Sequence, residues 1–448
     1  MIAASVALPI RATKAATTIP RRWVTIALLW VSLLLAACQG GAPLWLTPWR
    51  DADEAPPAAA VGNEPGRDLP ELHVLAPSVA PAADAQFLAL VEAFNQTETD
   101  VTANLTLRPD YDDALQAALA LATPPDLFVL DSGRVRDLAL AGVLAPFDPT
   151  LFNTQDLYPL LHAAFSLDGS FYCLPREVRT LALLYDRDRF DEAGLSYPDE
   201  TWTWDDLRAA AEALTDRETA TFGLALPPDF SRWLPFLYQA GGAVTDDDFS
   251  VMVINSDEAR DAMDFYVRLV FDGHAAAPAE LESAWAGEAL ARRRAAMAIE
   301  GNWALPYLRR VDPPPNFGVA ELPAGPRGRA TVAFATCYAM AAGSPHHAAA
   351  QRLAQQLSQA DILWRTPEID GAYMPPRPSL AAAWRQQHPD QTPFLIGLAT
   401  AQLWQFGPRF NPLLQMVNAG LQQGFLGVRS VADILAQADG VGNRALGR

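Results

Sequence analysis

The fold of this protein is decided by residues 171–195, which read FYCLPREVRTLALLYDRDRFDEAGL. Pro175 interrupts the first apolar run, and three charged residues follow it before a second apolar run begins: Arg176, Glu177 and Arg179. A proline inside a strand marks an edge, a bulge or a change of direction. Because an unpaired charge is costly to bury, these side chains must reach solvent or line a cleft. We therefore expect the chain to cross here between two lobes, beside a wet cleft.

The overall composition is that of a soluble globular protein rather than a disordered or polytopic one. The 448 residues are 50% hydrophobic and 19% charged, which suits two or three domain-sized units. The net charge of −19 argues against a nucleic-acid partner and against broad docking on anionic lipid. Lys14 is the only lysine, so the chain beyond the N-terminal segment can hold no P-loop, Schiff-base lysine or Ser–Lys dyad.

The N-terminal segment has the features of an export signal. Basic residues precede an apolar run at residues 23–34, which is shorter than the roughly 20 residues that a membrane-spanning helix needs. The run ends in LAAC at residues 35–38, which resembles a bacterial lipobox. This resemblance implies a signal peptide at 1–37, cleavage before Cys38 and a lipid on the Cys38 sulfur. The alternative is an uncleaved anchor helix. Either way we expect the body of the protein to lie outside the cytoplasm, tethered to a membrane.

Strands alternate with helices along the rest of the chain. Residues 38–70 are rich in proline, alanine, glycine and acids without periodicity, and we expect a flexible tether there. Apolar strands at 72–76 and 127–130 are separated by helical periodicity, and the same alternation returns in the second half. There a capping-box pattern at Thr203–Asp206 predicts the start of a helix, and a further helix is expected at 393–402. The sequence therefore predicts an α/β fold in which each of two lobes is a mostly parallel sheet flanked by helices. Such sheets bind ligands at the carboxyl ends of strands, where Asp131 and Ser78 are expected.

Four motifs resemble those of the extracellular solute-binding proteins of ABC importers, the sugar-binding family that includes maltose-binding protein. They are PDLFV at residues 125–129, WTWDDL at 202–207, AAMAIEGNW at 295–303 and LPAGP at 322–326. No single motif is diagnostic, but their order and spacing together are. With the lipobox, the resemblance runs from Cys38 to nearly the end of the chain.

The resemblance implies a two-lobed periplasmic-binding-protein-like fold, in which crossing hinge strands join the lobes and let them close on a ligand. It divides the chain into lobe 1, at 71–176 and 340–390, and lobe 2, at 177–339 and 391–448. The implied function is that of a lipid-anchored, monomeric substrate-binding component of an ABC importer. Its partners are a mono- or oligosaccharide and the transmembrane permease subunits that receive it. The resemblance implies no catalytic activity, no cofactor and no metal ion.

The family's ligand contacts match several residues of this chain. Glu177 matches a carboxylate that reaches the ligand from the crossing strand, Trp303 matches an aromatic platform, and Asp131 matches a polar strand-end site. Phe230, Trp233 and Trp404 are matched less closely. Two further candidates rest on their place in the chain: Ser78 just after the first strand, and Arg176 beside Glu177. These residue types suit a sugar, because an aromatic ring covers its C–H face while carboxylates and arginines bond its hydroxyls.

Each candidate also has a structural alternative. Glu177 can pair with Arg176 or Arg179, Asp131 can cap the helix after its strand, and the aromatic residues can pack in the core. Cys173 and Cys337 occupy near-equivalent points of the two crossing strands that the resemblance implies. They can form a disulfide that stiffens the hinge, or remain two buried thiols.

Two other functions fit the sequence. The same fold can bind a polyamine or another cationic solute, which the acidic composition would tolerate. Alternatively, a secreted glycoside hydrolase can be built from a pair among the 52 acidic residues. The sequence contains no His-Glu-x-x-His, Cys-x-x-Cys or Gly-x-Ser-x-Gly motif, and its six histidines do not form a metal-binding pattern.

Overall fold

The structure, a computed structural model, describes residues 69–121, 123–365 and 373–447. The predicted signal peptide, the lipidated Cys38 and almost all of the predicted tether lie outside these residues. Within the described ranges, no helix is both long and apolar enough to cross a membrane.

Lobe 1 is built on three parallel strands with helices between them. Its elements are β1 (Glu71–Pro77), α2 (Pro81–Thr97), β2 (Thr102–Arg108), α3 (Tyr111–Leu119), β3 (Leu127–Asp131) and α4 (Ser132–Leu140). β1 lies in the middle, because it pairs with β2 on one side and with β3 on the other. Buried and half-buried residues alternate along β2, as expected for a strand with one face on the core. The order of strands and helices predicted here is confirmed.

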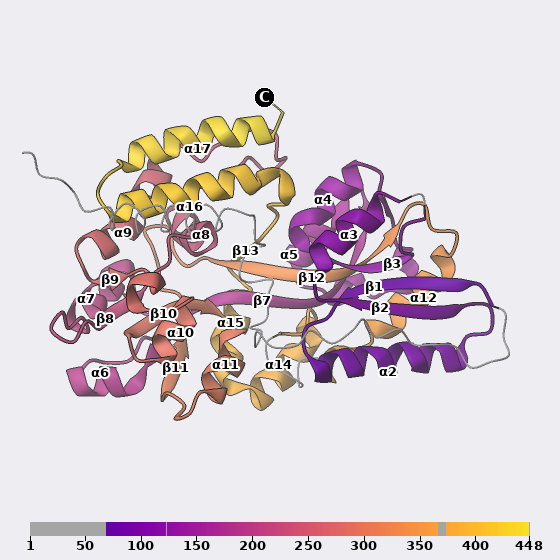
Figure 1. The fold of residues 1–448 in the computed structure, drawn as a ribbon, viewed down its shortest axis with the longest axis horizontal. Helices are drawn as coiled ribbons and strands as arrows, with labels where there is room; N and C mark the ends of the chain where they lie inside the picture. The colour runs from indigo at the N-terminus through magenta and orange to yellow at the C-terminus, as the bar shows by residue number, and fades with distance from the viewer. Residues whose placement is uncertain (1–68, 122, 366–372, 448) are drawn as a thin grey trace, which may run out of the picture. The chain divides into compact units, whose positions relative to one another are not determined.

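Two long antiparallel strands join the lobes: β7 (Cys173–Asp186) and β12 (Thr331–Ala341). Figure 1 shows them side by side between two groups of helices. β12 pairs with β3 of lobe 1, while β7 pairs with strands of lobe 2, so one strand order runs through both lobes. The crossing predicted from residues 171–195 is therefore confirmed. Short elements precede β7: β4 (Leu144–Ala145), α5 (Pro159–Phe165), β5 (Ser166–Leu167) and β6 (Ser170–Phe171).

The proline in β7 lies at a bulge. Thr336 of β12 faces Glu177, and the next residue of β12 faces Pro175, so Arg176 has no residue opposite it. Proline has no N–H to donate to the ladder, and a bulge can redirect the side chains beside it. Glu177 accepts a hydrogen bond from Thr336, and Arg176 is hydrogen-bonded to Tyr338, which shares a strand face with Thr336. The bulge thus turns two consecutive charged residues toward one side of the sheet.

Lobe 2 is a second α/β unit. Its strands are β7, β8 (Phe222–Ala225), β9 (Ala275–Ala276), β10 (Ala295–Gly301) and β11 (Phe317–Ala320). Its helices are α6 (Arg187–Ala193), α7 (Trp204–Ala213), α8 (Phe230–Gln239), α9 (Asp257–Phe271), α10 (Ala286–Ala291) and α11 (Ala304–Arg310). β8 is parallel to β9 and β10, whereas β7 is antiparallel to β10 and β11. The capping box predicted at Thr203 is present at the start of α7, where the Thr203 and Asp206 side chains bond each other's backbone N–H.

The C-terminal part returns to both lobes. Its elements are α12 (His347–Leu357), α13 (Ala360–Arg365), α14 (Pro378–Gln387), α15 (Thr392–Gly397), β13 (Ala401–Leu403), α16 (Asn411–Phe425) and α17 (Val431–Ala445). Arg352 of α12 bonds Glu98 beside α2, while the ring of Phe425 stacks on Tyr266 of α9. The helix predicted at 393–402 is wrong, because α15 ends at Gly397 and β13 pairs with β12 instead. That backbone pairing is a long-range contact that periodicity does not report.

Candidate ligand-binding site

One face of β12 gathers several of the candidate residues. Phe334, Thr336 and Tyr338 alternate along the strand and so point to the same side of it; we call these three residues the β12 face. Thr336 donates a hydrogen bond of 2.8 Å to Glu177. The ring of Phe334 lies edge-on to Trp303 of lobe 2, with 5.8 Å between ring centroids. The structure therefore brings together Glu177 and Trp303, which are far apart in the sequence, through two residues of one strand face.

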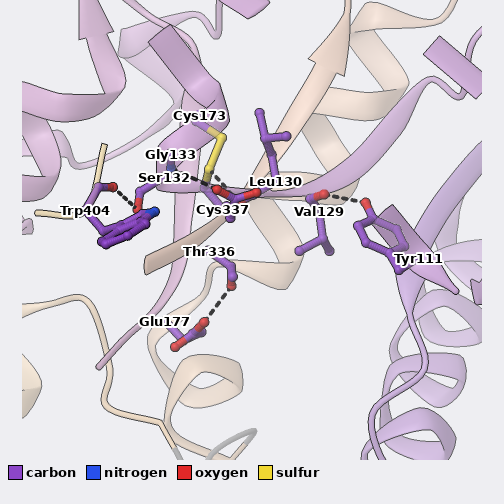
Figure 2. The surroundings of a disulfide bond; sticks show 11 residues. Tyr111, Val129, Leu130, Ser132, Gly133, Cys173, Glu177, Thr336, Cys337 and Trp404 are labelled. Atoms are coloured by element: carbon purple, nitrogen blue, oxygen red, sulfur yellow. Dashed lines mark hydrogen bonds between the residues drawn. A yellow bond between two sulfur atoms is a disulfide. The ribbon is translucent and has the colours of Figure 1, made fainter. Parts of the chain in front are cut away.

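Glu177 is a buried carboxylate with two hydrogen-bond donors among the residues that the structure describes. Only 3% of it is exposed, and it accepts hydrogen bonds from Thr336 Oγ1 at 2.8 Å and from Arg179 Nε at 3.1 Å (Figure 2 shows the first). Its ion-pair partner is thus Arg179 rather than Arg176. A carboxylate has about four lone-pair positions, so two donors leave room for a ligand hydroxyl. Ligand contact by Glu177 stays a prediction.

The two arginines beside Glu177 meet at an aromatic residue that the sequence analysis missed. The Arg179 guanidinium lies 4.2 Å from the ring centroid of Tyr373, and that of Arg176 lies 5.8 Å from the same ring. Arg176 also lies 6.0 Å from the ring of Phe87 in α2. Cation–π contacts operate within about 6 Å. Tyr373 follows the candidate arginines by nearly 200 residues, and no local signal links it to them.

The aromatic candidates form a chain of ring contacts but differ in exposure. Phe334 contacts Trp404, Trp404 contacts Phe230, and Phe230 contacts Trp233, with centroid distances of 5.7, 6.0 and 5.9 Å. Trp233, Phe230 and Trp404 are only 0%, 1% and 3% exposed, which favours the packing alternative for these three. Trp303 is half-buried, so part of its surface is open to a ligand.

The first turn of α4 lies against the segment that carries Trp404. Ser132 Oγ donates a 2.6 Å hydrogen bond to the Trp404 carbonyl, as Figure 2 shows. A Cβ atom on Gly407 would lie 2.4 Å from the Gly133 carbonyl oxygen, so this close approach requires glycine. Asp131, the residue before Ser132, is thereby held near the aromatic chain.

Asp131 and Ser78 both act at helix starts. Asp131 Oδ1 accepts a 2.9 Å hydrogen bond from the Gly133 N–H and caps α4, which is the structural alternative stated for it. Ser78 Oγ donates a 2.6 Å hydrogen bond to Asp84 in the first turn of α2. Ligand contact by either residue stays a prediction.

Burial raises the pKa of Asp131 to about 6, and the positive charge of Arg134 opposes part of this effect. In the unfolded chain an aspartate titrates near 3.9. Because the native pKa is the higher one, the folded protein binds the proton more tightly than the unfolded chain. The stabilisation that this proton provides is fully present below pH about 4 and is lost as the pH rises to about 6.

We expect Asp131→Asn to stabilise the protein relative to wild type at pH 7, by about 1 kcal/mol, and to have little effect at pH 4. Asparagine caps helices as well as aspartate and carries no charge to bury, while solvent at the half-buried site screens part of the gain. Urea unfolding of both proteins between pH 4 and pH 7 measures the difference.

Asp148→Asn is the matched control, because Asp148 also caps a helical turn but is exposed. Hydrogen bonds from Thr150 lower the pKa of Asp148, so this variant should lose stability relative to wild type as the pH rises. A stability difference for Asp131→Asn that stays constant with pH would show that the Asp131 carboxyl is not perturbed by burial.

A buried ion pair lies next to Trp303 in lobe 2, and sequence reasoning did not identify it. Arg232 Nη2 lies 2.6 Å from Glu300 Oε2, and the Trp303 Nε1–H donates to the same oxygen at 3.1 Å. Asp229 caps α8 and lies 3.6 Å from the Arg232 guanidinium. Burial raises the pKa of Glu300, against the opposing charge of Arg232. Glu300 adjoins Gly301 within the 295–303 motif, whereas its partner Arg232 lies outside this motif, in α8. The motif therefore contained one residue of the pair but gave no indication of the other.

The two cysteines of the crossing strands form a disulfide, with 5.5 Å between their Cα atoms. Figure 2 shows it beside Leu130 of β3, whose carbonyl oxygen is 3.3 Å from the Cys337 sulfur. It links β7 to β12 on the lobe 1 side of the bulge. Of the two alternatives left open for Cys173 and Cys337, the structure contains the bridge.

Two α/β lobes joined by crossing strands define the class of periplasmic-binding-protein folds. The family model of bacterial extracellular solute-binding proteins matches residues 79–361, which is more than half of the chain. The chain therefore belongs to this family, whose members bind solutes outside the cytoplasm and are not enzymes. The family resemblance and the fold predicted from the motifs are confirmed, whereas the lipid anchor stays a prediction.

Three known proteins illustrate the similarity. The maltotriose-binding protein of Pyrococcus abyssi is 25% identical over 240 residues, which cover 53% of this chain and only about half (50%) of that relative. An ABC substrate-binding protein of Listeria monocytogenes in complex with cycloalternan has a TM-score of 0.72 at 24% identity, and the match covers 85% of this chain and 100% of that one. The sugar-binding protein MalE of Xanthomonas citri has a TM-score of 0.72 at 22% identity, over 84% and 97% of the two chains. At these identities the structures establish the fold.

Proposed function

We propose that this protein is the substrate-binding component of an ABC importer, which binds a maltodextrin-like oligosaccharide at the β12 face and delivers it to the permease. The observation that carries the proposal is the arrangement at Phe334. Its ring contacts the half-buried Trp303, and in the strand pairing it faces Arg179, which pairs with Glu177. An aromatic ring, a carboxylate and a guanidinium thus lie around one residue of a crossing strand.

This set of groups suits a sugar. The indole of Trp303 can cover the C–H face of a pyranose ring, while Glu177 and Arg179 can form paired hydrogen bonds with neighbouring hydroxyls. Maltotriose and cycloalternan, which appear in the names of the similar proteins, support an oligosaccharide ligand. A polyamine is less well suited, because Arg176 and Arg179 flank Glu177 and would repel a cation.

The cellular setting is part of the same proposal. We propose that lipid on Cys38 tethers the protein and that residues 38–70 let it reach the permease. The lobes, at 71–176 with 340–390 and at 177–339 with 391–448, close on the ligand by bending the crossing strands. Labelling cells with a radioactive fatty acid tests the anchor: wild type should take up the label, and Cys38→Ala should not.

Thermal shift of the chain from residue 39 onwards tests the ligand. The panel contains glucose, maltose, longer maltodextrins, polyamines and amino acids. A ligand at a hundred times its dissociation constant adds about 2.7 kcal/mol, which raises the melting temperature by a few degrees. We expect this rise with maltodextrins. A rise with polyamines alone would keep the fold and overturn the sugar assignment, and cleavage of any sugar would favour the hydrolase.

A further inference from the structure

Two side chains, those of Arg232 and Trp303, converge on one buried carboxylate oxygen of Glu300 beside the β12 face. Glu300 Oε2 lies 2.6 Å from Arg232 Nη2 and 3.1 Å from the Trp303 indole nitrogen. The Glu300 and Arg232 side chains are only 1% and 8% exposed. The Arg232 guanidinium carbon lies 5.6 Å from the centroid of the Trp303 ring. Glu300 therefore joins a buried cation to the indole N–H.

The Trp303 ring lies between Gly301 and Phe334. Glu300 and Gly301 end β10, and Trp303 stands directly before α11. A Cβ atom on Gly301 would lie 2.1 Å from the Trp303 ring, so the indole occupies space that any other residue would fill. Phe334 touches the ring edge-on from β12. The glycine provides the space, Phe334 limits the tilt, and the hydrogen bond to Glu300 fixes the direction of the N–H edge.

Arg232 is held just as firmly in the first turn of α8. Its Nη1 donates a 2.8 Å hydrogen bond to Ser231 Oγ and lies 3.6 Å from Asp229 Oδ1. The pair therefore connects α8 to the end of β10, two elements separated by 68 positions in the sequence. The contacts that orient Arg232 therefore also orient Glu300. Because Glu300 accepts the indole N–H, they orient the indole of Trp303 as well.

Stability alone does not account for this pair. Removing two charges from water carries a desolvation penalty, and well-packed apolar residues in the same place are often equally or more stabilising. What an apolar pair cannot supply is an acceptor for the Trp303 N–H. An indole whose N–H is already bonded within the protein presents its ring face, rather than its polar edge, to a ligand.

We propose that Glu300 and Arg232 are positioning residues for Trp303, which hold the indole plane in the orientation that stacks on a sugar ring. The inference deepens the proposed function and rests on it for the contact between Trp303 and sugar. The ion pair itself touches no ligand. It acts only through the indole.

A double-mutant cycle tests the inference in the full-length protein solubilised in detergent. Arg232→Met/Glu300→Leu removes both charges together, so neither is left buried without a partner. With maltotriose as the probe, we expect the dissociation constant to rise about tenfold. This is the effect expected from the loss of one hydrogen bond to a charged acceptor. In a Trp303→Phe background, where there is no indole N–H, the same pair replacement should change the affinity less than about twofold.

Proton–nitrogen NMR of tryptophan indoles provides a readout that needs no sugar. The Trp303 signal is the one lost in Trp303→Phe, and we expect the pair replacement to move it upfield because the hydrogen bond is gone. Glu300→Gln keeps one acceptor oxygen and should restore most of the affinity. If Arg232→Met/Glu300→Leu does not fold, Glu300→Gln is the variant that tests the inference. We expect it to weaken maltotriose binding about threefold and to move the Trp303 indole signal upfield by a smaller amount.

Arg352→Met is the control, because it removes a pair with Glu98 in lobe 1 whose Nη2–Oε2 distance is a similar 2.7 Å. It should leave maltotriose binding and the Trp303 signal unchanged. Wild-type affinity in the Arg232→Met/Glu300→Leu variant would overturn the inference while leaving the proposed function intact. An equal loss in the wild-type and Trp303→Phe backgrounds would also overturn it. Failure of the wild-type protein to bind any sugar would instead reject the proposed function, and the inference with it.

Discussion

Trp303→Ala is expected to weaken oligosaccharide binding by about 100-fold, the largest effect that we predict for any single residue. The ring is half-buried, so it offers a face to the ligand that Trp233 and Trp404 do not. Truncation removes that face and leaves Glu300 without its indole donor. Isothermal titration with maltotriose measures the affinity, and circular dichroism measures the melting temperature.

The protein should remain folded in this variant. Losing a half-buried ring costs about 2 kcal/mol, which is less than the usual stability of a globular protein. Trp285→Ala is the matched control, because Trp285 is another half-buried tryptophan of lobe 2, packed against Tyr307. It should lower the melting temperature by a similar amount and leave the affinity unchanged.

Glu177→Gln should weaken binding about tenfold. If Trp303→Ala and Glu177→Gln both bind as wild type does, the β12 face is not the binding site.

Replacing both cysteines of the crossing strands with alanine should lower the free energy of unfolding by about 2–5 kcal/mol. The bridge links positions 164 residues apart, so it greatly restricts the unfolded chain. Both side chains are fully buried, and alanine also leaves part of their volume empty. We expect the melting temperature to fall by about 5 °C or more. Thermal unfolding with and without reductant measures the effect.

The reductant itself provides the control for the disulfide. It should lower the melting temperature of the wild-type protein toward that of Cys173→Ala/Cys337→Ala but not fully to it, because the two buried thiols still fill the volume that alanine leaves empty. It should not change the melting temperature of the double variant. Mass spectrometry of non-reduced peptides tests the bond directly. Two free thiols in the wild-type protein, or equal melting temperatures of the wild-type protein and the double variant, would contradict a stabilising bridge.

The sequence by itself determined the class of fold and the place of the crossing. Alternating strands and helices predicted α/β lobes, because a strand repeats its faces every two residues and a helix every 3.6. Pro175 with its charged neighbours located the crossing strand. The side chains at Thr203 and Asp206 predicted a helix start, because a capping box needs only residues within one turn. All of these signals are local. The structure confirms the α/β lobes, the crossing strand and the helix start that they predicted.

Only the tertiary structure decided which groups meet. The bulge leaves Arg176 without a residue opposite it, and the strand pairing places Thr336 against Glu177. Burial distinguishes the half-buried Trp303 from the fully packed Trp233 and Trp404. These facts depend on pairing between strands that are more than 150 residues apart and on packing between the helices that cover them.

The ion pair of Arg232 and Glu300 beside Trp303 is the clearest case of a contact that only the tertiary structure decided. The 295–303 motif contained Glu300 and Trp303, yet its sequence does not reveal that Arg232 of α8 reaches the same oxygen. A charged residue next to a glycine is usually solvated, and only folding removes that solvent. Local propensity acts over a few residues, whereas a site is made by contacts between distant ones. The sequence therefore determined the frame of this binding protein, and long-range packing decided its site.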